Sequence, residues 1–345
     1  MIPIQNIYYM LSYAFQVLNE QGYKNIATEQ FNNTGELMAA ILEKGIAIQL
    51  KRGLGKEYIP QTETLSSLRG KIDIAESIKT QSMLRKQLIC TYDEFSVNSI
   101  MNRIIKSTVE LLLRSNISKQ RKKNLRKLMV YFSEVDFIDL YTVNWNVQYN
   151  RNNQTYRMLI SICYLVVKGL LQTQSNGHTK LMDFLDEQRM CRLYEKFILE
   201  YYRREFKNQI TANASQIPWQ LDDEENFMLP VMQSDIMLQS GEKVLIIDAK
   251  YYEHSTQVQF DKHTLHSGNL YQIFTYVKNK EYEMREKDHT VSGMLLYAKT
   301  DEEIYPNNVY QMSGNQITVR TLNLNLPFDE IAGQLNTIAK THFDL

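Results

Sequence analysis

The segment VLIIDAKYY, residues 244–252, ends an apolar stretch with an acid and a base. Asp248 and Lys250 are two positions apart, so in a β-strand both side chains project from the same face of the sheet. A strand-end salt bridge at the surface explains an isolated Asp-x-Lys triplet without any chemistry. The residues upstream must therefore decide between a structural and a catalytic interpretation.

A strand pattern and a tight turn precede the triplet. Residues 227–238 are rich in strand-favouring side chains, and the sequence SGEK at 240–243 is typical of a turn. If Gly241-Glu242 is a two-residue type II′ loop, Ser240 pairs with Lys243. Continuing this register places Asp235 directly opposite Asp248, with β-carbons roughly 4.5–5.5 Å apart.

Two carboxylates at that separation repel each other unless a cation lies between them. Oxygen ligands suit Mg²⁺, which keeps several bound waters. Asp235 and Asp248 are therefore the candidate metal ligands. Lys250 could orient or deprotonate a water molecule, or stabilise a phosphate oxygen. The three residues together predict a metal-dependent phosphodiesterase.

Two predicted helices supply further polar residues. In the helix expected over residues 189–209, Glu195 interrupts a mostly apolar stripe that includes Cys191 and Ile198. A carboxylate that reaches solvent at the edge of the stripe is the alternative interpretation. In the sequence NLYQIFTYV, Gln272 and Tyr276 lie one helical turn apart, a spacing that an ordinary amphipathic helix also explains.

Taken together, these residues resemble the core of the PD-(D/E)xK nucleases, including the Gln-x-x-x-Tyr helix of the RecB-like branch. Ser234 precedes Asp235 where that family often has proline, a residue with no direct chemical role. Over the whole chain, six blocks in order look like McrC, the nuclease subunit family of the McrBC modification-dependent restriction systems. The blocks are IPIQNIYYMLSYAF (2–15), LRGKIDI (68–74), NRIIKST (102–108), YEKF (194–197), IIDAKYY (246–252) and NLYQ (269–272).

The resemblance implies a Mg²⁺-dependent endonuclease that cuts double-stranded DNA in a methylcytosine-directed restriction system. It implies catalytic roles for Asp235, Asp248, Lys250, Glu195 and Gln272, with Mg²⁺ on Asp235 and Asp248. It also implies a partner, the AAA+ GTPase McrB, which forms a ring into whose centre the N-terminal region of McrC inserts to stimulate GTP hydrolysis.

The order of predicted elements indicates an α/β (α+β) chain with two domains. Helical patterns dominate the first half, apart from a small β segment over residues 52–74, and a polar stretch at 173–179 favours a boundary there. We therefore expect an N-terminal domain at 1–175, which engages the partner, and a mixed-sheet PD-(D/E)xK nuclease domain at 176–345.

Composition is compatible with this interpretation. The chain has 345 residues, with 39 Lys+Arg and 39 Asp+Glu, so it lacks a global basic field. DNA affinity must therefore come from a partner or from local patches.

The densest basic cluster is KQRKKNLRK at 119–127. A solvated helix face is its first interpretation, and contact with DNA or a partner is the second.

Cellular location is also an expectation from sequence. Cys90, Cys163 and Cys191 have no C-x-x-C spacing, which fits a reducing cytoplasm. No signal peptide pattern opens the chain, and its longest apolar run, at 159–171, is too short to span a bilayer. We expect a cytoplasmic protein without a membrane segment.

The sequence KRGLGKE at 51–57 is not a phosphate-binding loop, because Glu57 follows the lysine where Walker A requires Ser or Thr. A nucleotide-driven motor would therefore be another polypeptide. The glycine-punctuated segment 51–69, with Lys51, Arg52 and Lys56, is the candidate for the tip inserted into the ring.

Two other functions remain open from sequence. The chain could be a non-catalytic activator of the ring whose nuclease fold serves only as a scaffold, although an intact Asp235, Asp248 and Lys250 argue against decay of the site. It could also be an autonomous RecB-like exonuclease, which an assay of the chain alone with linear DNA and Mg²⁺ would detect.

Overall fold

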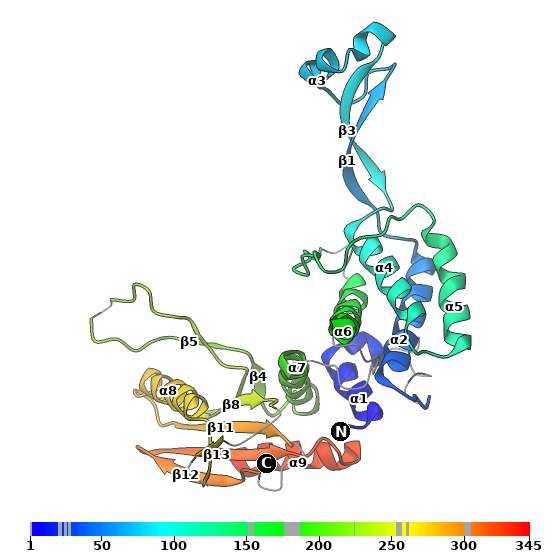
Figure 1. Ribbon diagram of the computed structural model, residues 1–345. Coiled ribbons are helices and arrows are strands. Elements are labelled where there is room, and N and C mark those ends of the chain that lie inside the picture. The colour runs from blue at the N-terminus through cyan, green and yellow to red at the C-terminus, as the bar shows by residue number, and fades with distance from the viewer. Residues whose placement is uncertain are drawn as a thin grey trace. The chain divides into compact units, whose positions relative to one another are not determined.

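The computed structural model describes residues 2–19, 23, 26, 29–150, 153, 155–175, 187–223, 225–252, 257–259, 262–299 and 305–345. The chain forms two compact units (Figure 1). The sheet unit comprises residues 1–31 and 185–345, and the helical unit comprises residues 32–184. Helices and a mixed sheet are both present, which confirms the predicted α/β class. No helix of the described residues has the length and apolar character needed to cross a membrane.

The helical unit is built on α2 (Thr34–Arg52), α4 (Ile100–Arg114), α5 (Lys119–Met129) and α6 (Tyr156–Ser175), with a 3₁₀ turn, η4 (Val130–Phe132), after α5. Side-chain caps define where three of these helices begin. Asn33, Ser99 and Ser118 each accept a hydrogen bond from the backbone N–H three residues later, which satisfies an otherwise unpaired donor of the first turn. The apolar faces of α2 and α4 form the core of this unit, including Leu37, Ile41 and Ile104.

A long β-arm extends from these helices (Figure 1). Strands β1 (Glu57–Leu65) and β3 (Leu88–Ser96) pair antiparallel over nine residues. Between them lie β2 (Lys71–Ile72), α3 (Ile74–Lys79) and the 3₁₀ turn η3 (Ser82–Arg85), which form the end of the arm. The short strands predicted over 52–74 are therefore wrong in extent, because pairing with β3, which the sequence analysis did not recognise, extends β1 to nine residues.

The root of the arm is held by a buried tyrosine. The N–H of Gly55 donates to the hydroxyl of Tyr156 at 2.7 Å, and this hydroxyl donates to Oδ1 of Asn102 at 2.7 Å. Lys51 and Arg52 end α2, and Lys56 directly precedes β1. All three are exposed, as expected, but they lie at the root of the arm and not at its end.

The sheet unit contains a six-stranded mixed sheet in the order β12-β13-β11-β8-β7-β4. Its strands are β4 (Thr211–Asn213), β7 (Ile236–Ser240), β8 (Lys243–Lys250), β11 (Thr290–Ala298), β12 (Asn308–Met312) and β13 (Asn315–Leu322). The three strands β8, β11 and β13 run parallel, and the outer pairings are antiparallel. Two short ladders lie outside it: β5 (Gln216–Ile217) with β6 (Met232–Gln233), and β9 (Gln257–Gln259) with β10 (Lys262–Thr264).

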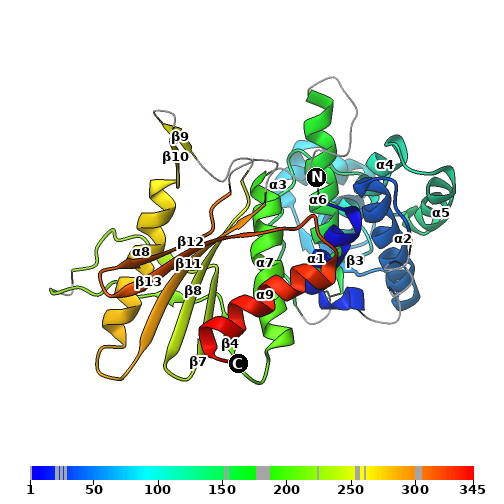
Figure 2. The ribbon, with the colours of Figure 1, turned by 90° about the horizontal axis from the view of Figure 1, so that it is seen from below.

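Helices cover both faces of this sheet (Figure 2). α8 (Ser267–Glu283) packs on the face that carries Val244, Ile246 and Leu295. Residues alternate between faces along a strand, so Leu245 and Met294 belong to the opposite face, beside α9 (Phe328–Phe343). α7 (Glu187–Glu205) is tied to α9 by the hydroxyl of Tyr202, which donates to the carbonyl of Leu335 at 3.0 Å.

The N-terminal helix α1 (Ile4–Ala14), which precedes the 3₁₀ turn η1 (Gln16–Asn19), belongs to the sheet unit. Nδ2 of Asn6 donates to the carbonyls of Leu324 and Leu326 at 2.7 and 2.8 Å. The ring of Tyr9 stacks on Phe328 with centroids 4.4 Å apart. The expected division at 175/176 therefore differs from the observed units, because contacts across more than 300 residues join the N-terminal 31 residues to the C-terminal half.

Candidate active site

The hairpin of β7 and β8 has the predicted register. Ser240 pairs with Lys243 and Ile236 with Ile247, and Gly241 has a φ of +57°, as the first central position of a type II′ turn requires. Asp235 lies one residue before β7, so the same register brings it opposite Asp248. The N–H of Ala249 donates to Oδ2 of Asp235 at 3.0 Å, which fixes this carboxylate against the end of β8.

Asp248 and Lys250 form a buried ion pair at the end of β8. Asp248 is only 1% exposed, and Nζ of Lys250 lies 2.9 Å from its Oδ1 and 2.8 Å from its Oδ2. The contact to Oδ1 has the geometry of a hydrogen bond, and the contact to Oδ2 is an ion pair without that geometry. The ammonium of Lys250 therefore compensates the buried charge of Asp248.

The electrostatics of the pair reflect burial and a second acid. Burial raises the pKa of Asp248 to about 7; the ammonium of Lys250 opposes this effect, and the carboxyl group of Asp235 adds to it. Burial alone lowers the pKa of Lys250, but the carboxylate of Asp248 outweighs it and the net pKa is raised. Lys250 is therefore a cation at neutral pH, facing two adjacent acids.

Glu195 on α7 joins this group. Burial raises the pKa of Glu195, and the charge of Asp235 is the second cause, so the two carboxylates are close enough to repel. The thiol of Cys191 donates to Oε1 of Glu195 at 3.1 Å and lies 3.8 Å from the carbonyl oxygen of Ala249. Cys191 thus links Glu195 to the end of β8. The sequence analysis treated Cys191 only as part of an apolar stripe, although its i to i+4 spacing from Glu195 was a signal.

α8 contributes Gln272 and Tyr276 from the other side of Lys250. Oε1 of Gln272 accepts from Nζ of Lys250 at 3.4 Å, and Nε2 of Gln272 donates to the hydroxyl of Tyr276 at 3.0 Å. The structure therefore brings together all five residues predicted for the site: Asp235, Asp248, Lys250, Glu195 and Gln272.

A further polar link was missed from sequence. Asn269, one helical turn before Gln272, donates from Nδ2 to the hydroxyl of Tyr297 at 2.9 Å. Tyr297 pairs with Lys250 across the parallel strands β11 and β8. This contact anchors the start of α8 to the strand beside the lysine. The spacing of Asn269 and Gln272 was visible, but the strand pairing that brings Tyr297 to them was not.

The donor set suits a hard cation that keeps its own waters. Asp235 and Asp248 offer carboxylate oxygens beside the end of β8. Among the described residues, no group of three or more His, Cys, Asp or Glu side chains is placed to hold one metal ion. Protein side chains in these ranges therefore do not fill the coordination sphere of a metal by themselves. Mg²⁺ is commonly bound by one or two carboxylates with water and substrate phosphate, and the two aspartates fit that requirement.

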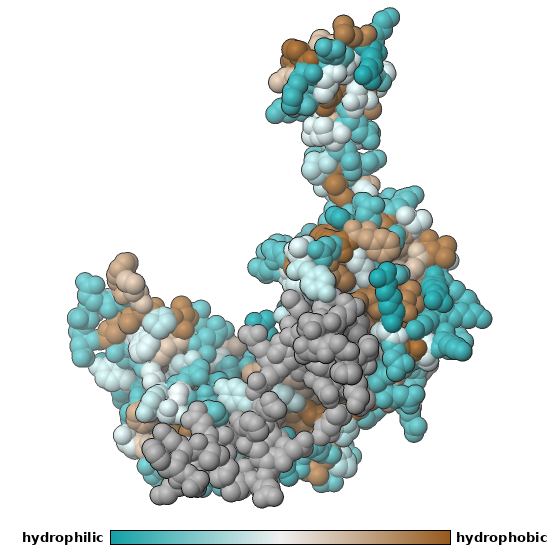
Figure 3. All heavy atoms as spheres, viewed as in Figure 1, coloured by the Kyte–Doolittle hydropathy of each residue, from teal (hydrophilic) through white to brown (hydrophobic). Residues whose placement is uncertain are grey.

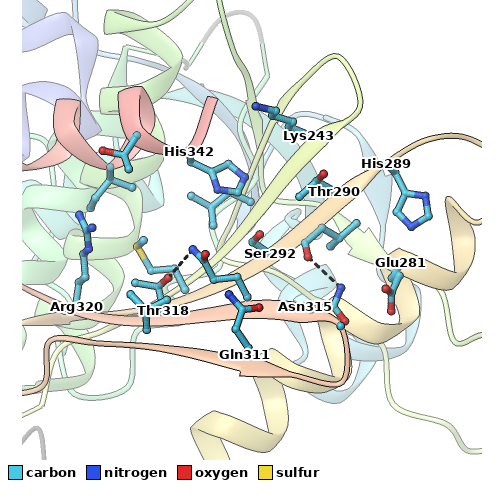
Figure 4. A pocket seen from close by; sticks show the side chains of 18 residues that line it. Lys243, Glu281, His289, Thr290, Ser292, Gln311, Asn315, Thr318, Arg320 and His342 are labelled. Carbon is cyan, nitrogen blue, oxygen red and sulfur yellow. Dashed lines mark hydrogen bonds between the residues drawn. The ribbon is translucent and has the colours of Figure 1, made fainter. Parts of the chain in front are cut away.

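A separate cavity of about 680 Å³ lies on the opposite face of the sheet, beside the end of α9 (Figure 4). Its polar lining includes Ser292, Thr318, Arg320 and His342. None of the five predicted site residues lines it. The cavity is therefore a different site from the acidic cluster, the name we give to Asp235, Asp248 and Glu195 with the adjoining Lys250 and Gln272.

Comparison with known proteins assigns the family. The model of the McrBC 5-methylcytosine restriction system component matches residues 5–298. The chain belongs to this McrBC family. A curated relative from Escherichia coli (strain K12), the type IV methyl-directed restriction enzyme EcoKMcrBC, is 31% identical over 329 residues, covering 94% of this chain and 93% of the relative. The match to the McrBC family contains the acidic cluster and the whole arm.

Two solved structures from Thermococcus gammatolerans are also similar. A half-complex from a tetradecameric assembly of McrB AAA+ hexamers with bound McrC has a TM-score of 0.49 at 18% identity, covering 97% of this chain and 76% of that chain. A structure of the McrBC complex has a TM-score of 0.42 at 21% identity, covering 59% of each chain.

Proposed function

We propose that this chain is the DNA endonuclease subunit of a GTP-dependent, methylcytosine-directed McrBC system, and that it hydrolyses phosphodiester bonds with Mg²⁺. One observation carries the proposal: the buried carboxylate of Asp248 lies beside both Lys250 and a second acid, Asp235, whose Oδ2 accepts from the N–H of Ala249. A structural salt bridge between Asp248 and Lys250 does not need a second carboxylate. A cation site needs both acids.

Asp235 and Asp248 would hold the Mg²⁺. Bound there, the ion supplies Lewis acidity toward a phosphate oxygen and lowers the pKa of a coordinated water. The hydrogen bond from the N–H of Ala249 keeps Asp235 oriented for this role.

Lys250 acts as a fixed positive charge. Its raised pKa keeps it protonated at neutral pH, so stabilising negative charge on the phosphate is favoured over removing a proton from water. Asp248 and Gln272 hold the ammonium from two sides, and Tyr276 orients Gln272. Gln272 is thus a positioning residue for Lys250.

Glu195 is the group best suited to receive a proton. Its pKa is raised by burial and by Asp235, which makes its carboxylate a stronger base than an exposed glutamate. The Cys191 thiol orients one oxygen, and the other remains available to a water molecule.

The test is cleavage of methylated duplex DNA with the partner ring, GTP and Mg²⁺. We expect Asp248→Ala and Lys250→Ala to reduce the cleavage rate by about 10²–10³ or more, because each removes an electrostatic stabiliser. Lys243→Ala, at the other end of β8 in a surface pair with Asp344, is the matched control and should cut normally. Unchanged cleavage by Lys250→Ala would mean that another group stabilises the phosphate.

We also propose an AAA+ GTPase ring as the partner, as in the Thermococcus McrB–McrC assembly. The end of the arm supports this proposal, because large apolar side chains gather there on the surface (Figure 3). They are Leu68, Ile74, Ile78, Met83 and Leu84, each at least 52% exposed. Several exposed large apolar side chains at one end of an arm favour a protein interface there. The arm end therefore replaces Lys51, Arg52 and Lys56 as the proposed tip.

A further inference from the structure

Helix α5 concentrates positive charge in a chain with no net charge. Six of its eleven residues are Lys or Arg, and none is Asp or Glu. The whole chain, by contrast, has equal numbers of basic and acidic residues. The helix therefore cannot neutralise its own charge through pairs along its surface.

One face of α5 is fixed to α2 by acidic groups. Nη1 of Arg121 lies 2.9 Å from Oε2 of Glu43, and Nδ2 of Asn124 donates to Oε1 of the same glutamate at 2.9 Å. The N-cap hydroxyl of Ser118 donates to Oε1 of Glu36 at 2.8 Å. Leu125, on the same side, is fully buried. These contacts fix which face of α5 packs against α2.

The opposite face carries Lys119, Lys123, Arg126 and Lys127, which we name the α5 basic stripe. These positions are i, i+4, i+7 and i+8, so they share one face of the helix. All four are exposed, and in the part of the chain that the structure describes none has an ion pair or hydrogen-bond partner for its side chain. Like charges at i and i+4 destabilise a helix, so the stripe persists because the opposite face is clamped.

We propose that the α5 basic stripe binds the phosphate backbone of duplex DNA. The stripe spans about 12 Å along the helix axis, comparable to about three or four phosphates of one DNA strand. A protein partner is the weaker fit, because lysine is depleted in protein interfaces. Tyr131, 68% exposed, follows α5 in the 3₁₀ turn η4 and offers an aromatic surface for a sugar or base.

The stripe would give the chain sequence-independent DNA affinity of its own. Backbone contacts position a duplex without reading its bases. The inference rests on the proposed function in that DNA is the substrate, but it concerns binding and not cleavage. It assigns the helical unit a role in holding DNA in addition to its contact with the ring.

The experiment measures binding of the full-length chain to a fluorescently labelled duplex by anisotropy, in EDTA, from 50 to 200 mM salt. The test variant replaces Lys119, Lys123, Arg126 and Lys127 by Gln, a residue that preserves helix propensity. We expect its affinity at 50 mM salt to fall at least tenfold and its log–log salt slope to become shallower by about 3 to 4. The control replaces four exposed cations of the sheet unit, Lys207, Arg285, Lys287 and Lys340, by Gln.

Equal affinities and slopes for the two quadruple variants would overturn the inference. So would normal DNA binding together with a loss of GTPase stimulation, which would assign the stripe to the protein partner. A wild-type chain that does not bind the duplex at 50 mM salt would also overturn it. The proposed function fails on different grounds, namely if the wild-type complex does not cut DNA or if Asp248→Ala cuts as well as wild type.

Discussion

At the scale of single residues, the site depends on one carboxylate held away from water. Asp248 is buried next to both a cation and another acid, and the balance of these influences raises its pKa to about 7. An exposed aspartate would be fully ionised well below this pH. In the proposed Mg²⁺ site, protons would therefore compete with the metal ion for Asp248 in the physiological range.

This competition predicts a pH dependence. Below about pH 7 Asp248 is protonated and binds Mg²⁺ poorly, so cleavage should increase as pH rises through this value. Raising the Mg²⁺ concentration should move the midpoint of the rate profile to lower pH, because the metal displaces the proton. Rates measured from pH 5.5 to 8.5 at several Mg²⁺ concentrations test this. A midpoint that does not respond to Mg²⁺ would exclude Asp248 as a ligand.

Cys191 offers a second prediction at this scale. Its thiol donates to Glu195 and lowers the pKa of that carboxyl group. Cys191→Ala should reduce cleavage about two- to tenfold, the value of one ordinary hydrogen bond, and shift the acidic limb of the pH profile upward. Cys191→Ser retains a donor and should restore both the rate and the profile. If serine and alanine behave alike, the thiol does not position Glu195.

At the scale of elements, the sheet and α8 meet so closely that one position excludes a side chain. Gly293 on β11 faces Ile273 and Val277 of α8, and a β-carbon there would lie 2.8 Å from a side-chain atom of each. Helix and strand can approach only because this residue is glycine. The same contact holds α8, and with it Gln272, against the site.

Gly293→Ala should therefore destabilise the sheet unit by about 1–3 kcal/mol through overpacking. The control is Gly333→Ala in α9, where a β-carbon meets no atom within 4 Å and alanine should stabilise the helix by about 0.5–1 kcal/mol. Urea unfolding of both full-length variants measures the shifts. A Gly293→Ala protein as stable as wild type would mean that α8 moves away from the sheet without cost.

At the scale of the whole molecule, the chain divides into two units that contain different functional features. Every residue of the acidic cluster lies in the sheet unit, and the arm lies wholly in the helical unit. GTPase stimulation and DNA cleavage should therefore be separable by substitution.

Asp248→Ala should retain full stimulation of the partner ring and lose cleavage. Leu68→Ser with Leu84→Ser, at the arm end, should weaken stimulation at least tenfold and leave Mg²⁺ binding by the purified chain unchanged, since both side chains are exposed and outside the core. Substitution of Lys51, Arg52 and Lys56 tests the root of the arm separately. Phosphate release and DNA cleavage are followed in parallel. If folded Asp248→Ala loses both activities, the division of labour is wrong.

The sequence by itself determined the local geometry of the site. Alternation along a strand and a glycine in the turn are properties of neighbouring residues, so they were enough to place Asp235 opposite Asp248 and Lys250 on the same face as Asp248. Helical spacing left Glu195 and Gln272 open to an ordinary structural interpretation, and the family resemblance assigned them to the site. Tertiary structure alone decided that α1 joins the sheet unit, that β3 extends β1 into an arm, and that Tyr297 supports the site. It also decided the pKa of Asp248, because burial depends on which distant segments exclude water, and no local pattern encodes those contacts.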